Sequence, residues 1–403
     1  MKDIIIFTVS YPYGTKEQFL ETEIKYLSQH FKKVIVIPAY ISKEARGVPA
    51  NVSVDTVFAE KNSNLHFFMS SLFSKYLYKE LAKHPFVLLS LARLSKLFSF
   101  IGKGRSLYKH LKNYYDHEYI FYSYWFNGSV FGCYLYDKYA HEISFYTRVH
   151  GSDLYLEVNK NYLPLRPLIL SKIKKVFTIS EHGKEYLQRH YQVNENKLKV
   201  SRLGTQEQNI STLMSREPSE FCIVSCSHIS PVKRIDMLIK ALSIVAKNNL
   251  EINIKWVHIG SGKEQKVLEG LAFSMSSENL KMNFLGGMSN KDIFEYYKTH
   301  DIDLFVNVSR SEGLPVTFME AFNCGIPVFA IDNGGISEIV NNDNGILLKH
   351  DSSLEQIASG LSDCIRNKDE LFSKKCVART TWEKSYNADS NYIKFCKELN
   401  END

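Results

Sequence analysis

The stretch that most constrains the fold of this chain runs from residue 302 to residue 348. It opens with an apolar run, Ile302 to Val308, which is short enough to be a buried parallel strand. After a polar turn, a helix is expected from Pro315 to Gly325, because proline favours the first helical position and glycine the position just past the end. Pro327 to Ile331 reads as the next strand. A strand, turn, helix and strand in this order predict a parallel crossover, and therefore an α/β fold.

Two carboxylates in this stretch are candidates for a binding site. Glu312 lies in the turn, and Glu320 lies eight residues later inside the expected helix, pointing away from the apolar face formed by Phe318 and Phe322. Open parallel sheets bind ligands beyond the carboxyl ends of their strands, and free N–H groups after Gly313 can bind a phosphate there. An anion site beside two carboxylates suits a sugar nucleotide. Taken alone, two glutamates at this spacing are equally compatible with a solvated pair on a helix.

The surrounding motifs carry a family resemblance. SRSEGLP at 309–315, followed by MEAF, GIPV and GGISE, resembles the donor-site core of the GT4 family of retaining glycosyltransferases, of the bacterial capsule and cell-surface polysaccharide type. The resemblance implies an α/β GT-B fold, with two Rossmann-like domains facing across a deep cleft and a C-terminal helix that crosses back to the first domain. It also implies that Glu320 binds the donor ribose and that Glu312 lies by the donor sugar as a catalytic residue. Gly313, Leu314 and Pro315 would belong to the donor-binding loop.

A second candidate segment lies at 227–234. A helix with one apolar face is expected after Pro231, and Lys233 in its first turn could reach a phosphate held at the helix start. The segment resembles the GT4 pattern of an arginine and a lysine that neutralise the donor diphosphate. Lys233 matches the lysine, whereas His228 stands where most members have arginine. Arg234 could supply the missing charge, and we place both His228 and Arg234 among the donor-binding residues.

The first half of the chain offers weaker candidates. Gly14 lies in the first strand–helix turn, where glycine lets the backbone approach a ligand closely. In GT4 enzymes the corresponding loop lies against the donor diphosphate. His150 is followed by glycine at the end of an expected strand, and the resemblance places it near the donor sugar and acceptor as a catalytic residue, with Arg148 and Asp153 on the acceptor side. A lone histidine is more often structural, so that alternative stays open.

The 403 residues leave room for two or three domains. We expect an acceptor-binding domain at 1–204, a linker at 205–219, a nucleotide-sugar domain at 220–380 and a crossover helix at 381–403. The net charge of +6 is too small to indicate nucleic acid as a partner. The seven cysteines are scattered and predict reduced thiols in a cytoplasm, with no zinc site. No run reaches the roughly 18 apolar residues of a membrane span.

Residues 60–115 differ from the rest of the first half. Between residues 62 and 112, nine lysines and arginines stand against the single acid Glu80, interleaved with phenylalanine, tyrosine and leucine. One interpretation is an inserted set of helices that lie on an anionic membrane surface, which would make the protein peripheral on the inner face of the cytoplasmic membrane. The other is amphipathic helices that pack their apolar side on the sheet.

The resemblance implies a retaining, metal-independent transfer of a hexosyl or N-acetylhexosaminyl group. The donor is expected to be a nucleotide sugar, UDP-linked, and the acceptor a glycan or a polyprenyl-linked glycan. No cofactor and no metal site are expected. Two alternatives stay open: a GT-B epimerase or phosphorylase, and a non-catalytic partner subunit. His228 favours the partner subunit, whereas Glu312, Glu320 and Lys233 speak against it.

Overall fold

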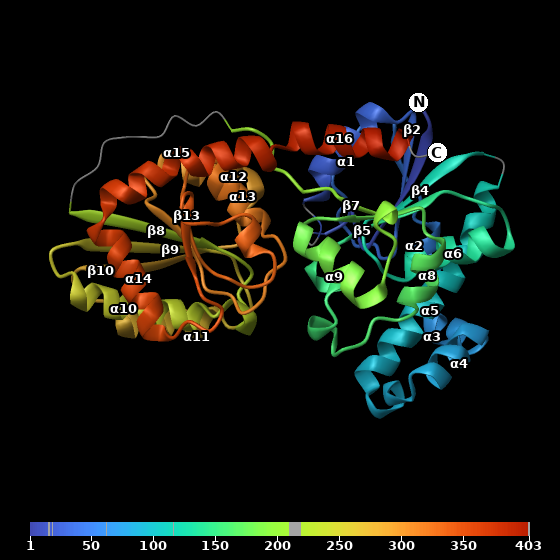
Figure 1. Cartoon of the computed structure of the whole chain (residues 1–403), viewed down its shortest axis with the longest axis horizontal. Helices are drawn as coiled ribbons and strands as arrows, with labels where there is room; N and C mark the ends of the chain where they lie inside the picture. The colour runs from blue at the N-terminus through green and yellow to red at the C-terminus, as the bar shows by residue number, and fades with distance from the viewer. Residues whose placement is uncertain (15–16, 18, 62, 116, 209–218, 402–403) are drawn as a thin grey trace. The chain divides into compact units, whose positions relative to one another are not determined.

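The chain forms two compact units in a computed structural model that describes residues 1–14, 17, 19–61, 63–115, 117–208 and 219–401. The first unit comprises residues 1–202 and 390–403, and the second comprises residues 203–389. Each contains one parallel β-sheet (Figure 1). Of the expected linker, residues 209–218 lie outside the described residues, and 205–208 belong to the second unit.

The sheet of the first unit has seven strands in the order β3-β2-β1-β4-β5-β6-β7. All neighbouring strands are parallel. The central strands are apolar on both faces, as a doubly covered parallel sheet requires. The strands are β1 (Asp3–Thr8), β2 (Lys33–Pro38), β3 (Val52–Val54), β4 (Tyr119–Ser123), β5 (Phe145–Val149), β6 (Lys175–Thr178) and β7 (Leu198–Val200).

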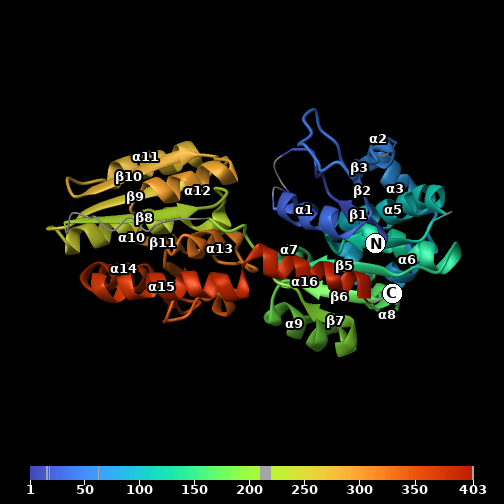
Figure 2. The same cartoon turned by 90° about the horizontal axis from the view of Figure 1, so that it is seen from above.

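Helices cover both faces of this sheet. α1 and α16 lie on one face, whereas α5, α6 and α8 lie on the other (Figures 1 and 2). The helices are α1 (Leu20–His30), α2 (Val57–Glu60), α3 (Asn64–Leu72), α4 (Lys75–Lys83), α5 (Leu91–Leu111), α6 (Gly128–Tyr139), α7 (Gly151–Leu154), α8 (Arg166–Lys172), α9 (Glu181–Tyr191) and α16 (Ala388–Glu401), with 3-10 turns η1 (Pro85–Leu89), η2 (Lys112–Tyr114), η3 (Glu157–Asn159) and η4 (Glu195–Lys197).

The last helix returns to the first unit, as expected. Tyr392 of α16 stacks on Tyr26 of α1 with ring centroids 5.5 Å apart, and Phe395 lies 5.2 Å from Tyr122 of β4. The expected single crossover helix from residue 381 onward is wrong, however. It is two helices, because the N–H of Ala388 donates to the carbonyl of Thr205 instead of continuing the helical ladder.

The apolar side chains of residues 60–115 divide into two sets. One set is buried in the core of the first unit and includes Phe67, Leu77, Leu97, Phe100, Ile101 and Leu107. The other set is exposed and includes Leu65, Phe73, Leu88, Leu89 and Leu91. The segment therefore contributes to the core of its unit, and it also carries apolar side chains that its own packing does not cover. None of the helices in the described ranges is long and apolar enough to cross a membrane.

The second unit has a six-stranded parallel sheet in the order β10-β9-β8-β11-β12-β13. One face is covered by α10, α11 and α14, and the other by α12, α13 and α15 (Figure 1). The strands are β8 (Glu220–Cys226), β9 (Asn253–Ile259), β10 (Leu280–Gly286), β11 (Leu304–Asn307), β12 (Val328–Ile331) and β13 (Gly345–Leu348); the helices are α10 (Ile235–Asn248), α11 (Gln265–Met275), α12 (Asn290–Thr299), α13 (Val316–Asn323), α14 (Leu354–Arg366) and α15 (Lys368–Ser385), with 3-10 turns η5 (Pro231–Lys233) and η6 (Ile336–Glu338).

Residues 302–348, the stretch that most constrains the fold, form β11, α13, β12 and β13. β11 and β12 are parallel neighbours, which confirms the crossover. α13 ends before Gly325, whose φ of +66° is the left-handed conformation that glycine adopts without strain. Phe318 and Phe322 are fully buried, and Glu320 is buried as well, so α13 has no solvated face. The turn between β11 and α13 thus lies at the carboxyl edge of the sheet.

Candidate functional site

An ion pair between Lys233 and Glu312 marks the centre of the candidate site in the second unit. The ammonium of Lys233 lies 2.6 Å from Oε1 of Glu312, and the two side chains are 22% and 11% exposed. The amide of Asn307, the last residue of β11, donates to the same oxygen at 3.0 Å. Since an ammonium has three donors, Lys233 retains capacity to bind a second anion beside Glu312.

The backbone before α10 positions Lys233. Pro231 to Lys233 form the 3-10 turn η5, and Arg234 then adopts a left-handed φ of +53° before α10 begins. Lys233 therefore precedes α10. The sequence-based prediction that it lies in the first turn of this helix is wrong. The N–H of Arg310 donates to the carbonyl of Val232 at 2.9 Å, which ties this turn to the loop that carries Glu312.

Further hydrogen bonds fix the loop at 309–315. Asn307 Oδ1 accepts from the N–H of Ser309 at 2.9 Å, and the amide of Asn333 donates to the Ser309 carbonyl at 2.7 Å. Gly334 has a φ of +67°, and a Cβ built on it would lie 2.1 Å from the carbonyl oxygen of Glu312. Only glycine fits there, so the loops after β11 and β12 approach each other closely around Glu312.

Glu320 lies behind this loop, on α13, and is 5% exposed. The amide of Asn290, the first residue of α12, donates to its Oε1. Burial raises the pKa of Glu320 to about 7, and the hydrogen bond from Asn290 opposes this only in part. Cys226, at the end of β8, is close enough to both Glu320 and Lys233 for their charges to act on its thiol. A buried carboxylate with a single amide donor and a raised pKa is a candidate for binding hydroxyls.

The other donor-side residues surround this group. Leu314 is buried, and Pro315 is the N-cap of α13, so the N–H groups of that helix begin at Val316, three residues after Gly313. His228 is exposed in the loop after β8. Arg234 folds back so that its guanidinium contacts the Met237 sulfur. The pKa of Arg234 is lowered, mainly by burial and to a smaller extent by the positive charge of Arg310. In this conformation Arg234 is turned toward its own helix.

A second group of polar residues gathers at the carboxyl edge of the first unit's sheet. His150, after β5, lies between the rings of Tyr124 and Trp125, with centroids 4.7 and 4.4 Å away. Within the part of the chain that the structure describes, neither ring nitrogen of His150 has a hydrogen-bond partner. Burial and the charge of Arg148 lower its pKa well below the ordinary value. Burial therefore disfavours the charged form of His150, and its two buried ring nitrogens have no protein partner among the described residues.

Asp153 and Arg148 have structural partners. Asp153 accepts from the N–H of His150 at 2.6 Å and from the N–H of Phe126 at 2.7 Å, so it fixes the loop that carries His150. Arg148 is fully buried; its guanidinium lies 3.3 Å from Glu23 and donates to the hydroxyl of Tyr122 at 3.0 Å. This arrangement leaves no exposed face of Arg148 for an acceptor and favours a structural role.

The first loop is organised by a buried carboxylate. Glu17 is 2% exposed and accepts from the N–H groups of Val9, Ser10 and Tyr11 at 3.1, 2.6 and 2.7 Å. It also accepts from the indole of Trp125 at 2.6 Å. Gly14 has a φ of +64° in the same loop. Its neighbours 15, 16 and 18 lie outside the described residues.

The sequence contains one Asp-x-Asp triplet, Asp301-Ile302-Asp303. Asp303 is buried at the amino end of β11, where its carboxylate accepts from the N–H of Cys222 at 2.7 Å. It therefore ties β11 to β8 at the edge of the sheet opposite Glu312. In the described ranges no three histidine, cysteine or carboxylate side chains form a group that could hold a metal ion.

Comparisons with known sequences place the second unit in context. Residues 210–379 match the family model of glycosyl transferases group 1. An uncharacterized glycosyltransferase from Haemophilus influenzae is 27% identical over 210 residues, which cover 51% of this chain and 55% of the relative. The O-antigen biosynthesis glycosyltransferase WbnH from Escherichia coli is 26% identical over 166 residues, covering 39% and 44%. The chain thus spans about half the length of the curated relatives it matches.

Solved structures extend the likeness to the whole chain. A glycosyltransferase from Rickettsia africae has a TM-score of 0.68 at 18% identity, covering 100% of this chain and 98% of the other. TarM from S. aureus, in a complex that includes UDP, also has a TM-score of 0.68, at 14% identity, covering 99% and 100%. At such identities the likeness concerns the fold. The chain therefore has the two Rossmann-like domains of the GT-B fold, and its residues 210–379 are similar to the group 1 glycosyl transferases.

Proposed function

We propose that this protein transfers a sugar from a nucleotide sugar to a hydroxyl of an acceptor, with retention at the anomeric carbon and without a metal ion. The observation that carries the proposal is the contact of Lys233, Glu312 and Asn307 at the carboxyl edge of the second sheet. A partly exposed cation beside a carboxylate, in a rigid turn that precedes a helix, suits a diphosphate with a sugar attached. The group 1 match over the same residues supports it.

In this proposal the bond between the anomeric carbon and the diphosphate oxygen breaks, and a bond from the acceptor oxygen to that carbon forms. The acceptor proton passes to the leaving phosphate. Lys233 and the N–H groups after Gly313 stabilise the negative charge that grows on the diphosphate, and preorganised charges of this kind usually lower a reaction barrier more than any other feature of a site. Glu312 orients the sugar and offsets positive charge on its ring. Glu320 accepts hydrogen bonds from the ribose.

The first unit would bind the acceptor near His150, whose two free ring nitrogens can accept from or donate to sugar hydroxyls. We propose a glycan or polyprenyl-linked glycan as acceptor and a UDP-linked hexose or N-acetylhexosamine as donor. The role of WbnH in O-antigen biosynthesis and the UDP in the TarM complex support this choice.

Calorimetry with UDP and UDP sugars tests donor binding. Glu320→Ala should weaken the binding of UDP by roughly 1–3 kcal/mol, because the ribose loses hydrogen bonds to a charged group. Glu295→Ala is the matched control, since Glu295 is an exposed carboxylate on α12 in the same unit, and it should bind as the unmodified protein does. Equal affinity in both variants would remove Glu320 from the donor site.

Nucleotide release, measured with and without acceptor, tests the reaction. Acceptor-dependent release of UDP together with a new glycosidic product is the expected result. Release of free sugar or sugar phosphate without acceptor would indicate an epimerase or phosphorylase instead. UDP binding without any turnover would indicate a non-catalytic partner subunit.

A further inference from the structure

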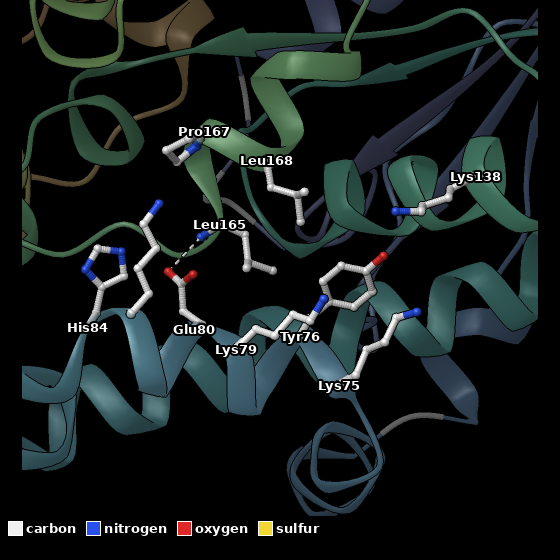
Figure 3. Close-up of a pocket in the computed structure, with 10 residues that line it drawn as sticks. Lys75, Tyr76, Lys79, Glu80, His84, Lys138, Leu165, Pro167 and Leu168 are labelled. Atoms are coloured by element: carbon white, nitrogen blue, oxygen red, sulfur yellow. Dashed lines mark hydrogen bonds between the residues drawn. The ribbon is translucent and has the colours of Figure 1, made fainter.

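A basic pocket lies on the helical flank of the first unit, between α4, the end of α6 and the start of α8. Figure 3 shows Lys75 and Lys79 on α4 and Lys138 on α6 around its opening, with Leu165 and Leu168 on the far wall. Its volume is about 270 Å³. Its lining contains no residue of a β-strand, so it is separate from the polar groups at the carboxyl edge of the sheet.

The charges of this pocket are unbalanced. Its lining includes four lysines and one carboxylate, Glu80, which gives an excess of three positive charges. Glu80 is buried, and its Oε1 accepts from the hydroxyl of Tyr162 at 3.2 Å and from the N–H of Leu165 at 3.1 Å. Across the described residues, no ion pair joins any of the four lysines to a carboxylate. The lysines are Lys75, Lys79, Lys83 and Lys138.

The lysines of α4 form one row. Lys75, Lys79 and Lys83 are spaced four residues apart, so they lie on one side of the helix, and all three are exposed. Tyr76, Leu77 and Glu80 are the buried residues of this helix, and Tyr76 and Glu80 line the pocket together with the lysines. Four cations around a small pocket that contains a single carboxylate favour an anion with several oxygens, such as a phosphate.

Exposed apolar side chains flank the same helix in the sequence. Phe73, two residues before Lys75, is 75% exposed. Beyond His84, Leu88, Leu89 and Leu91 are 56%, 86% and 86% exposed. Since α4 has nine residues and so is about 13 Å long, the two sets follow the ends of a short helix in the sequence. A binding site for a free phosphate in water would not require these side chains.

We propose that this pocket binds the phosphate of an anionic phospholipid headgroup, while Phe73, Leu88, Leu89 and Leu91 enter the membrane interface. Lysines that hold headgroups beside apolar side chains that enter the acyl boundary are the two components of interfacial binding. The proposal rests on the first unit alone and stands independently of the donor site. It places the helical segment 60–115 against the membrane.

Sedimentation with vesicles tests the proposal on the full chain. The protein should sediment with vesicles of phosphatidylcholine and phosphatidylglycerol at low salt, dissociate at high salt and ignore pure phosphatidylcholine. The triple variant Lys75→Gln, Lys79→Gln, Lys83→Gln should partition roughly a hundredfold less, at about tenfold for each 1.4 kcal/mol and about 1 kcal/mol for each lysine. Its matched control removes the same charge from exposed lysines of the second unit, Lys240→Gln, Lys247→Gln, Lys263→Gln, and should keep most of the binding.

Two further measurements decide whether the pocket binds a phospholipid headgroup or a soluble phosphate. Leu88→Ser with Leu89→Ser leaves the charge unchanged and should still reduce vesicle binding, because interfacial insertion is lost. The proposal would be overturned if this double variant bound vesicles as the unmodified protein does. It would also be overturned if the triple lysine variants of the first and second units lost equal amounts of binding, because the attraction would then be non-specific. Titration with inorganic phosphate supplies the other arm: saturable binding of phosphate by a protein that ignores phosphatidylglycerol vesicles would make the pocket a site for a soluble anion. All substituted side chains are exposed, so circular dichroism should show unchanged folding.

Discussion

Two buried glutamates, one in each unit, show how differently the fold treats a carboxylate. Glu23 of α1 is fully buried and has a cationic partner, the guanidinium of Arg148 at 3.3 Å, together with the hydroxyl of Tyr122 at 2.7 Å. Although burial disfavours the charged guanidinium, the Glu23 carboxylate raises the pKa of Arg148. Glu320 of α13 is almost as buried, but it has the amide of Asn290 in place of a cation. A paired buried charge supports the fold, whereas an uncompensated one is retained where a ligand supplies the missing partners.

The largest expected effect comes from breaking the compensated pair. Arg148→Ala should lower the free energy of unfolding by about 3–5 kcal/mol, because Glu23 is left as a buried carboxylate without its cation. Chemical denaturation measures this. The control is Arg189→Ala, which removes an arginine from an exposed ion pair with Glu185 in the same unit and should change stability by less than about 1 kcal/mol. A stable Arg148→Ala protein that has lost only acceptor binding would restore Arg148 to the acceptor side.

The burial of Glu320 should make the stability of the fold depend on pH. Burial raises the pKa of Glu320 to about 7, above the value of the unfolded chain, so the folded state holds a proton that the unfolded state has lost. Its contribution to stability is therefore present at pH below about 4.5 and disappears as pH rises through about 7, with an amplitude of about 3 kcal/mol. Glu320→Gln should be more stable than the unmodified protein at pH 8 and similar at pH 4.5. Parallel stability curves for the two proteins would contradict the shift.

The next largest effect is expected on turnover, when Lys233, the partly exposed partner of Glu312, is replaced. Lys233→Ala should lower the rate of glycosyl transfer by about a hundredfold or more, since the growing charge on the diphosphate loses a preorganised cation. The fold should persist, because Asn307 still donates to Glu312. The control is Lys240→Ala, which removes an exposed lysine paired with Asp236 on α10 and should leave turnover unchanged. Near-normal turnover of Lys233→Ala would mean that Arg234 carries the diphosphate.

The comparison of the two units also explains what the sequence could predict. The order of strands and helices follows from short apolar runs, turn residues and caps; Ser180, for example, caps α9 by accepting from the N–H of Gly183. Glu312 and Lys233 could be found because each lies between a parallel strand and the helix that follows it. Their contact could not be predicted, because the left-handed Arg234 that ends η5 has no signal in the sequence.

Other parts of the site depend on residues far apart in the chain. Asn290 lies 30 residues from Glu320 in the sequence, and Glu17 lies 108 residues from Trp125, so no local pattern connects them. Asn307 does carry a signal, since it is a polar residue at the end of an apolar strand. Arg148 stands only two residues before His150, yet its guanidinium lies over the ring of Phe395 of α16, because β5 ends at Val149 and His150 already belongs to the following loop.

The smallest expected effect concerns His228, which stands where the resemblance to the GT4 pattern led us to expect an arginine. His228 is exposed in the loop after β8, so an arginine there fits without displacing buried atoms. His228→Arg should change the free energy of unfolding by less than about 0.5 kcal/mol, as is usual for surface substitutions. It adds a permanent cation close to the turn that carries Lys233, so UDP should bind equally well or more tightly, most clearly at low salt.

Calorimetry at two salt concentrations measures this, with His300→Arg on an exposed position after α12 as the control. If the site needs only positive charge near the diphosphate, His228→Arg keeps or raises turnover, and the departure from the family pattern is neutral. A large loss of turnover with intact UDP binding would show instead that the imidazole has a specific role, such as transferring a proton at neutral pH, which arginine cannot perform because its pKa exceeds about 12. The two outcomes separate a tolerated substitution from a site built around histidine, and neither depends on the stability of the fold.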